Sequence, residues 1–531
     1  ENLLTDILEG WAACNYCYMA YRTHSKKDPD ESLTNNKEQN VQISTPSIHP
    51  KFAFNKNALS EKYKLKLKDA ELKFVVAGSH SFNSLENARI LTLIQTSIEI
   101  GANFGLVDVQ DIFYGRKTIH EEALLKFTQY TTQIRSLLDE PIQQHCLAGT
   151  DDIWTDDLMK RSYLDFTVFF VNDAYELKHT ILSFGDTPIT TDQGSNMIKA
   201  LSLTDEARYS CLAHRTNTVL ETAWENVKIL NAEFKMFCTS VSNLRTYCQQ
   251  SGGIQFKLPK TLKSSSGTRP WRSYFLIHNS LHQSYESLLI ILRERGEQHR
   301  ILQIDPQLLH EISTFMEKFS LIFDNLVFSN QLTLQNVIPS YYRMSEYCII
   351  DNKRKNSIIN LLKVQIAKEL IEKYLTSTTQ LHWIATYLDP TFKDLFVIDK
   401  SYLLEQKKSI KDEDPFATIR AVRGTVSSTT VSANSFTDEI GRQLQIYERT
   451  LYELPEDSNP LIFWSDQQNV LPILSKIAKS VFVIQASSAE SERHFSIAGQ
   501  VVTEQRSQLE PECLESLVVL KEVYLNKTWP K

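Results

Sequence analysis

The sequence predicts an α+β or α/β protein, in which one small sheet is combined with long stretches of helix. Two observations carry this prediction. Residues 146–192 are rich in aromatic and β-branched side chains separated by turn residues, a pattern typical of strands. Much of the remaining chain places apolar residues at helical spacing. With 531 residues the chain is too long for one compact core, so several domains are expected.

The N-terminal region begins with half of a zinc-finger pattern. Trp11 is followed by Cys14 and Cys17 at the spacing of a ligand pair, but the two histidines that would complete the site are missing. Residues 24–50 are polar, as in a linker. From residue 56 to 145 the pattern is helical: one helix is expected to stop at Gly101, and a second to run from residue 119 to 138.

The strand-like region predicts a meander. A first strand ends near Trp154, and the runs 163–171 and 175–184 form a hairpin around Asn172. A step from strand to helix follows at Asp192. Three strands in a meander followed by such a step are the opening of an RNase H-like sheet. However, the fourth strand should run parallel to the first, and the few residues between Phe184 and Ile189 are too short for a helical crossover. We therefore expect either that residues are missing there or that the core is damaged.

After residue 200 the chain is almost continuously helical up to about residue 411, and a Ser/Thr-rich linker then precedes further helices. The resulting domain prediction covers the whole chain. It comprises 1–23 (partial finger), 24–55 (linker), 56–145 (helical DNA-binding or dimerisation domain), 146–200 (first part of the core), 201–413 (large all-α insertion domain), 414–436 (flexible linker) and 437–531 (C-terminal helices of the core).

Three acidic residues occupy positions suited to metal-dependent cleavage of nucleic acid. Such chemistry uses two divalent ions held by Asp and Glu from separate elements, because Mg²⁺ prefers carboxylate oxygens. Asp152 lies in a strand, Asp192 lies between a strand and a helix, and Glu492 lies in the first turns of a helix. Ser487 and Glu490 fit a capping box, which leaves Glu492 as the freer carboxylate. Taken alone, each position is better explained as an ordinary turn or helix-end residue.

The motifs around these acids resemble those of the hAT (hobo–Activator) superfamily of DNA transposases, most closely its Hermes-like members. TDDIWT (150–155) resembles T-x-D-x-W-T, TDQGSNM (191–197) resembles T-D-x-x-x-N, and SSAESERHFSIAG (487–499) resembles the S-x-x-x-S-E-R-x-F-S-x-A-G block. The resemblance extends from about residue 51 to 525. It implies that Asp152, Asp192 and Glu492 are catalytic ligands of Mg²⁺ (or Mn²⁺). It also implies that Cys14 and Cys17 begin a zinc-binding BED finger.

Further residues are assigned by the same resemblance. Cys211 and His214 match a C-x-x-H pair near the active site, for which buried packing is the simpler explanation. GTRPWRSYF (267–275) resembles a T-R-W motif whose tryptophan stacks on a flipped base, although Pro270 intervenes here, and a core tryptophan is an equal alternative. The expected DNA contacts are Trp154, Lys260, Lys263, Arg269, Trp271, Arg272 and Arg493. Residues 251–275 contain no acid, so this local surface can bind phosphates despite a chain charge of −7.

The resemblance implies a nuclear cut-and-paste transposase that binds the ends of its element and target DNA and associates with itself. The alternative is a domesticated relative that kept the fold as a DNA-binding regulator, and a different RNase H-like nuclease is a third option. The eight scattered cysteines suit a reducing compartment. No run of 18 apolar residues occurs, so no membrane-spanning helix is expected.

Overall fold

A computed structural model of the chain describes most of its residues. The described segments are 11–13, 20–22, 60–78, 80–155, 160, 162–181, 187–203, 207–263, 270–328, 330–350, 357–393, 433–450, 452, 458–502 and 510–526. The chain divides into two compact units, Glu1–Phe113 and Tyr114–Lys531. The expected motifs at Cys14, Cys17 and Arg269, and most of the expected linkers, lie outside the described segments.

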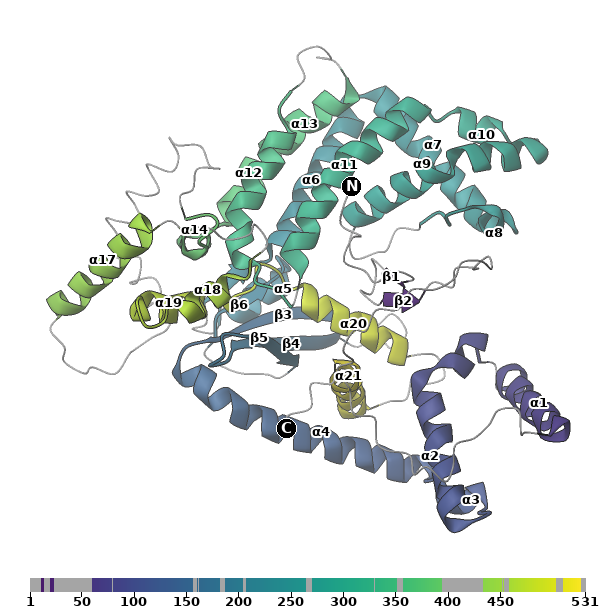
Figure 1. Ribbon diagram of the computed structural model, residues 1–531. Helices are drawn as coiled ribbons and strands as arrows, with labels where there is room; N and C mark the ends of the chain where they lie inside the picture. Colours follow the sequence, from purple (N-terminus) through teal and green to yellow (C-terminus); the bar gives the residue numbers. More distant parts are fainter. Residues whose placement is uncertain are drawn as a thin grey trace, which may run out of the picture. The chain divides into compact units, whose positions relative to one another are not determined.

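The second unit is built on a five-stranded mixed sheet in the order β5-β4-β3-β6-β7 (Figure 1). Strand β4 pairs antiparallel with both β3 and β5, whereas β6 pairs parallel with β3 and with β7. The strands are β3 (Leu147–Thr155), β4 (Ser162–Val171), β5 (Leu177–Ile181), β6 (Ile189–Thr191) and β7 (Arg208–Ser210). The meander and the parallel fourth strand are therefore present, and the step after β6 leads into helix α5 (Ser195–Leu201).

Register explains how a short link can join β5 to β6. Ile189 pairs with Gly149, Gly149 with Val168, and Val168 with Thr180, so both ends of the link lie in the same row of the sheet. Three strand spacings amount to about 14 Å, and eight extended peptide units reach about 26 Å. Distance alone therefore does not demand a helical crossover. The expected break itself falls on residues 182–186, which lie outside the described segments.

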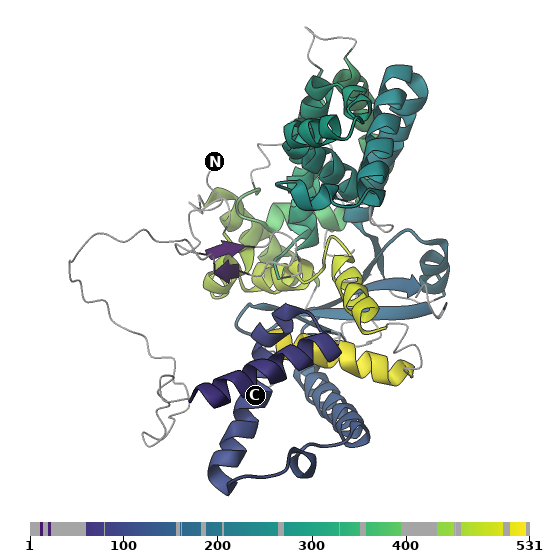
Figure 2. The same cartoon turned by 90° about the vertical axis from the view of Figure 1, so that its right-hand side faces the viewer.

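Helices cover both faces of the sheet (Figures 1 and 2). On one face, α4 (Arg116–Gln143) buries Tyr130, Ile134 and Leu138 against Leu147 and Val168. The other face lies beneath α14 (Gln380–Leu388), α18 (Pro460–Asp466), α19 (Pro472–Phe482) and α20 (Ala489–Val501). Helix α21 (Pro511–Asn526) contacts both α4 and α20. Since its apolar face is buried on the sheet, α4 belongs to the second unit and not, as expected, to the N-terminal helical domain.

Most helices between β7 and α14 share a separate hydrophobic core, and Figure 2 shows them gathered in teal and green, whereas Leu334 packs in the core beside the sheet. Trp224, Phe234 and Phe319 are among its fully buried side chains. The elements are α6 (Leu212–Leu230), α7 (Ala232–Gln250), α8 (Ile254–Lys257), α9 (Pro270–Glu294), α10 (His299–Leu302), α11 (Pro306–Val327), η4 (Leu334–Asn336), α12 (Val337–Tyr347), α13 (Ile358–Glu369), η6 (Leu370–Tyr374) and η7 (Leu375–Ser377).

Two expected boundaries move. Helix α17 (Ala433–Arg449) begins inside the linker expected over 414–436. In the first unit, which contains β1 (Trp11–Ala13), β2 (Ala20–Arg22), α1 (Glu61–Ala77), η3 (Phe82–Glu86), α2 (Ala88–Phe104) and α3 (Val109–Ile112), helix α2 continues past Gly101. It ends at Gly105, whose φ of 84° suits glycine, so the expected stop at Gly101 is wrong.

No single described helix is long and apolar enough to cross a membrane, although the bent pair Ala88–Phe104 and Val109–Gln143 passes on length and composition.

Candidate active site

Asp152 and Asp192 are brought together by the parallel pairing of β3 and β6. Asp151 pairs with Thr191, so the next residue of each strand lies at the same end of the sheet. Asp152 is 8% exposed, and its Oδ1 accepts a hydrogen bond from the backbone N–H of Ile153 at 2.8 Å. Burial, the nearby carboxylate of Glu492 and the carboxylate of Asp192 together raise the pKa of Asp152 to about 7.

A tight turn fixes the side chain of Asp192. Its Oδ1 accepts a hydrogen bond from the backbone N–H of Gly194 at 2.9 Å. A Cβ at Gly194 would lie 3.1 and 3.2 Å from the two carboxylate oxygens, so any other residue here would press on this carboxylate and shift it by a few tenths of an ångström. The backbone carbonyl of Asp192 accepts a hydrogen bond from Arg208, which also donates to Thr191 Oγ1 at 2.8 Å. Arg208 therefore holds the turn from the neighbouring strand β7.

Glu492 is presented by the first turn of α20. The expected capping box is absent: the N-cap residue is Ser488, and its side chain makes no capping hydrogen bond. The start of the helix is held instead by tertiary contacts. The backbone N–H of Ser488 donates to Cys211 Sγ at 3.4 Å, and Ser491 Oγ lies 3.4 Å from Thr150 Oγ1. The helix therefore begins next to both β3 and the start of α6.

His214 contacts Glu492 directly. Its Nε2 lies 3.3 Å from Glu492 Oε1, and Glu492 is a partly buried side chain, 18% exposed. Burial by itself lowers the pKa of His214, but Cys211 and the carboxylates of Glu492 and Asp152 outweigh it and raise that pKa to about 10. Burial raises the pKa of Cys211, but His214 outweighs it and lowers that pKa below its usual value. Cys211 is buried packing as expected, whereas His214 faces the carboxylates.

Asp151 is the acidic neighbour that sequence reasoning did not select. It is 5% exposed, and burial together with Asp165, Asp152 and Asp192 raises its pKa to about 7. Strand alternation places its side chain on the sheet face opposite that of Asp152. The adjacent pair Asp151–Asp152 in a buried strand was the available signal, since two successive buried carboxylates are costly without a function.

The three carboxylates do not surround a single metal position. Among the described residues, they do not form a group whose ligand atoms all lie within 4.8 Å of one another. Each of the other two nevertheless acts electrostatically on Asp152. Because two-metal sites hold ions about 3.5–4 Å apart, their ligands span more than a single coordination sphere. The arrangement is compatible with such a site.

The residues expected to contact DNA have different surroundings. Trp154 is half-buried, with ring centroids 5.6 Å from Tyr163 and 5.9 Å from Phe495. Arg493 is hydrogen-bonded to Glu490 and donates to the carbonyl of Val327 at 2.7 Å, so it pairs with an acid.

In the basic segment, Lys260 is exposed and Lys263 half-buried. Trp271 and Arg272 lie in the first turn of α9, after Pro270 as its first residue, where proline is favoured. The side chains of Trp271 and Arg272 are outside the described part of the chain.

Comparison with known proteins points to one family. The hAT family C-terminal dimerisation region matches residues 440–524, which include Glu492. The chain is also 22% identical to the "Transposable element Hobo transposase" of Drosophila melanogaster. That similarity covers 92% of this chain and 86% of the relative.

Proposed function

Because this chain belongs to the hAT superfamily of transposases, we propose that it is a cut-and-paste DNA transposase with Asp152, Asp192 and Glu492 as its catalytic carboxylates. The reaction would nick DNA beside the ends of the element, form a hairpin on the flanking DNA and join the freed 3′-OH to target DNA. The observation that carries the proposal is the parallel pairing of β3 with β6, which brings Asp152 and Asp192 to the same end of the sheet, where Glu492 also acts on Asp152.

We propose an RNase H-like fold for the core. The supporting observation is the strand order, in which an antiparallel meander, β3 to β5, is extended on its β3 side by two parallel strands. The helices from α6 to α13 would then be an insertion between β7 and the C-terminal helices of the core. In such a core the catalytic carboxylates would be Asp152, within β3, and Asp192, directly after β6.

The donor set fits Mg²⁺ or Mn²⁺. Burial first, and then the carboxylates of Glu492 and Asp192, raise the pKa of Asp152, and a divalent cation would favour its charged form against both effects. Asp152 and Asp192 would hold the ions, with Glu492 completing the set. When bound, the ions activate the attacking oxygen and stabilise the leaving oxygen.

The neighbouring residues would position these acids. His214, with a pKa of about 10, is positively charged near neutral pH and holds Glu492 through their 3.3 Å contact. Gly194 leaves Asp192 room to form its turn. Ser488 and Ser491 fix the start of α20 against Cys211 and Thr150. The chain thus supplies a preset arrangement of acids for the reacting phosphate.

DNA would be held by basic side chains and stacking rings outside this set. We assign phosphate contacts to Lys260, Lys263, Arg269 and Arg272, and base stacking to Trp271 at the start of α9. Trp154 and Arg493 are less suited to DNA, because the first stacks on protein rings and the second pairs with Glu490.

Cys14 and Cys17 would belong to a zinc finger, and action on chromosomal DNA would place the protein in the nucleus.

The alternative, a domesticated DNA-binding relative, needs no catalytic carboxylates. Strand cleavage separates the two functions. A labelled duplex carrying the terminal repeat of the element that encodes the chain is incubated with the full-length protein and Mg²⁺ or Mn²⁺. Nicked and hairpin products that require the cation support the transposase. Binding of the duplex without any cleavage, with either cation, would favour the domesticated alternative.

A further inference from the structure

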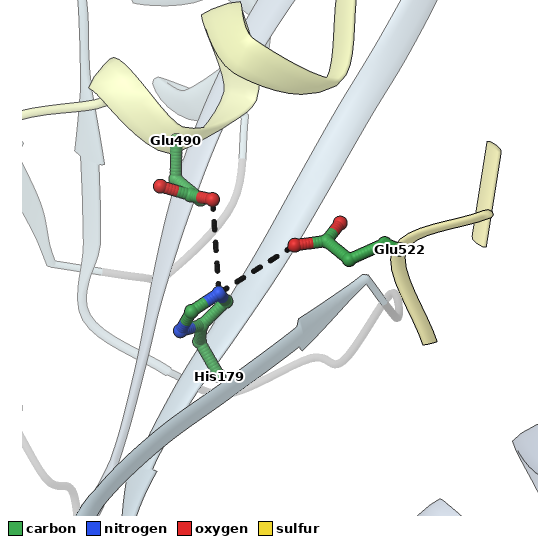
Figure 3. A group of neighbouring side chains, drawn as sticks. All are labelled: His179, Glu490 and Glu522. Atoms are coloured by element: carbon green, nitrogen blue, oxygen red, sulfur yellow. Dashed lines mark ion pairs between the residues drawn. The ribbon is translucent and has the colours of Figure 1, made fainter. Parts of the chain in front are cut away.

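A second cluster of potential metal ligands lies apart from the catalytic acids. His179 on β5, Glu490 on α20 and Glu522 on α21 point toward one another (Figure 3). His179 Nε2 lies 3.6 Å from Glu490 Oε1 and 3.7 Å from Glu522 Oε1. One ligand atom from each of the three residues lies within 4.8 Å of the other two. Three elements that are distant in sequence therefore meet at one point.

A second imidazole borders the same point. His494 is 2% exposed, and its Nε2 lies 3.7 Å from Glu490 Oε1 and 2.7 Å from Glu522 Oε2. At 2.7 Å this nitrogen pairs with the Glu522 carboxylate. The other ring nitrogen, Nδ1, contacts Asp165 Oδ1 at 3.0 Å, which orients the ring with Nε2 towards the two glutamates. His494 therefore orients Glu522 from outside the three-ligand group, as supporting residues do at metal sites.

We propose that His179, Glu490 and Glu522 bind a divalent ion of the zinc class, with water as the fourth ligand. With metal–ligand bonds of about 2.0–2.2 Å, the edges of a tetrahedron are about 3.3–3.6 Å long. The two separations between His179 Nε2 and the glutamate oxygens are 3.6 and 3.7 Å, close to these edges. An imidazole with two carboxylates favours zinc over magnesium, which prefers oxygen ligands and retained water.

The burial of the cluster's side chains and a cavity that leads to them also favour a bound ion. The side chains of His179, Glu490 and Glu522 are 13%, 7% and 15% exposed, so two carboxylates are largely removed from water. Arg493 pairs with Glu490 and His494 with Glu522, and an ion placed between the two carboxylates would neutralise the charge that remains. A cavity of about 330 Å³, lined by His179, Glu522 and Asn330 among others, reaches the cluster and provides an entry path.

The site is separate from the catalytic acids. Glu490 and Glu492 are two positions apart on α20, so their side chains point about 200° apart around the helix. Glu490 therefore faces β5 and α21, while Glu492 faces His214. An ion at this point would fasten the helix that carries Glu492 to the sheet and to the C-terminal helix.

Metal analysis of the full-length protein tests the proposal. All proteins carry Cys14→Ser and Cys17→Ser, so that the N-terminal thiols contribute no zinc. They are loaded with Zn²⁺, dialysed and analysed by inductively coupled plasma mass spectrometry. We expect one zinc per chain, lost in His179→Gln and in Glu522→Gln. Glu512→Gln is the matched control, because it removes an exposed carboxylate from the same helix and should retain the zinc.

A spectroscopic measurement does not depend on how the variants fold. Co²⁺ added to the unsubstituted ligand set in the same Cys→Ser background should give the visible absorption of four-coordinate cobalt, and Zn²⁺ should displace it. Absence of both this absorption and bound zinc would overturn the proposal. Equal zinc content in the control and in both ligand variants would overturn it as well. Neither outcome depends on DNA cleavage.

Discussion

Asp152, Asp192 and Glu492 differ from surface acids because the chain holds each of them by a specific local contact. Asp152 is buried in β3, Asp192 is turned back onto the N–H of Gly194, and Glu492 contacts His214. The constraint at position 194 is space and not backbone angle, since a φ of −57° is open to any residue. The proposed cleavage would therefore depend on the residues that hold the three acids as well as on the acids.

Gly194→Ala should reduce strand cleavage by about 10- to 100-fold, as does loss of other residues that orient metal ligands. The new Cβ would lie about 3.1 Å from the Asp192 carboxylate and push it out of position. The free energy of unfolding should change by less than about 1 kcal/mol. Cleavage assays and denaturant unfolding measure the two effects.

Gly441→Ala in α17 is the matched control, because its Cβ would meet no atom within 4 Å. Cleavage by that variant should equal the wild type. Equal activity of Gly194→Ala and Gly441→Ala would show that the turn does not position Asp192.

At the scale of elements, a buried histidine at the start of a helix makes the stability of the fold depend on pH. His382 in α14 is fully buried, and its Nδ1 accepts a hydrogen bond from the backbone N–H of Thr379 at 3.0 Å. Burial lowers the pKa of His382 from 6.5 to about 4. The unfolded chain thus binds a proton more readily than the folded one between these pH values. The stabilising contribution is complete above pH 6.5 and is lost as the pH falls towards 4.

Unfolding measured by denaturant from pH 7 to pH 4 should therefore show a loss of about 3 kcal/mol that is attributable to this histidine. His382→Asn keeps an acceptor for the Thr379 N–H but cannot gain the proton. Its stability should fall less over the same range. Parallel pH profiles for the two proteins would contradict a buried, neutral His382.

The start of α9 is where DNA distortion is expected. Trp271→Ala should slow hairpin formation by about 5- to 150-fold, from a stacking loss of about 1–3 kcal/mol per base, and should leave the first nick nearly unchanged. The reason is that only the hairpin step requires an unstacked base at the element end. Time courses of nicked and hairpin products measure both steps. Equal slowing of the two steps would exclude the stacking role.

At the scale of the whole molecule, local sequence patterns predicted which helices and strands form better than where these elements begin and end. The meander and the strand-to-helix step at Asp192 could be predicted because aromatic and β-branched residues mark them strongly. The cap of α20 could not, because Ser488 and Ser491 are held by Cys211 and Thr150, residues hundreds of positions away. The same holds for the contact of His214 with Glu492 and for the cluster around His179, which arise from tertiary packing.

Self-association is a property of the whole chain. The match to a C-terminal dimerisation region over residues 440–524 predicts at least a dimer. Sedimentation velocity of the full-length protein should give a species of twice the monomer mass of 61.2 kDa or larger. A monomer at all concentrations, with DNA or without it, would contradict this prediction.

Glu492 is assigned to catalysis and not to DNA binding, and Glu492→Gln separates these two roles. Cleavage and binding of the same terminal-repeat duplex are measured on one protein preparation, with the exposed Glu512→Gln as control. We predict that cleavage falls at least about 100-fold, since a metal ligand contributes no less than the residues that support it, while the Kd for the duplex stays within about twofold. Cleavage at the rate of the control would show that Glu492 is not a catalytic ligand.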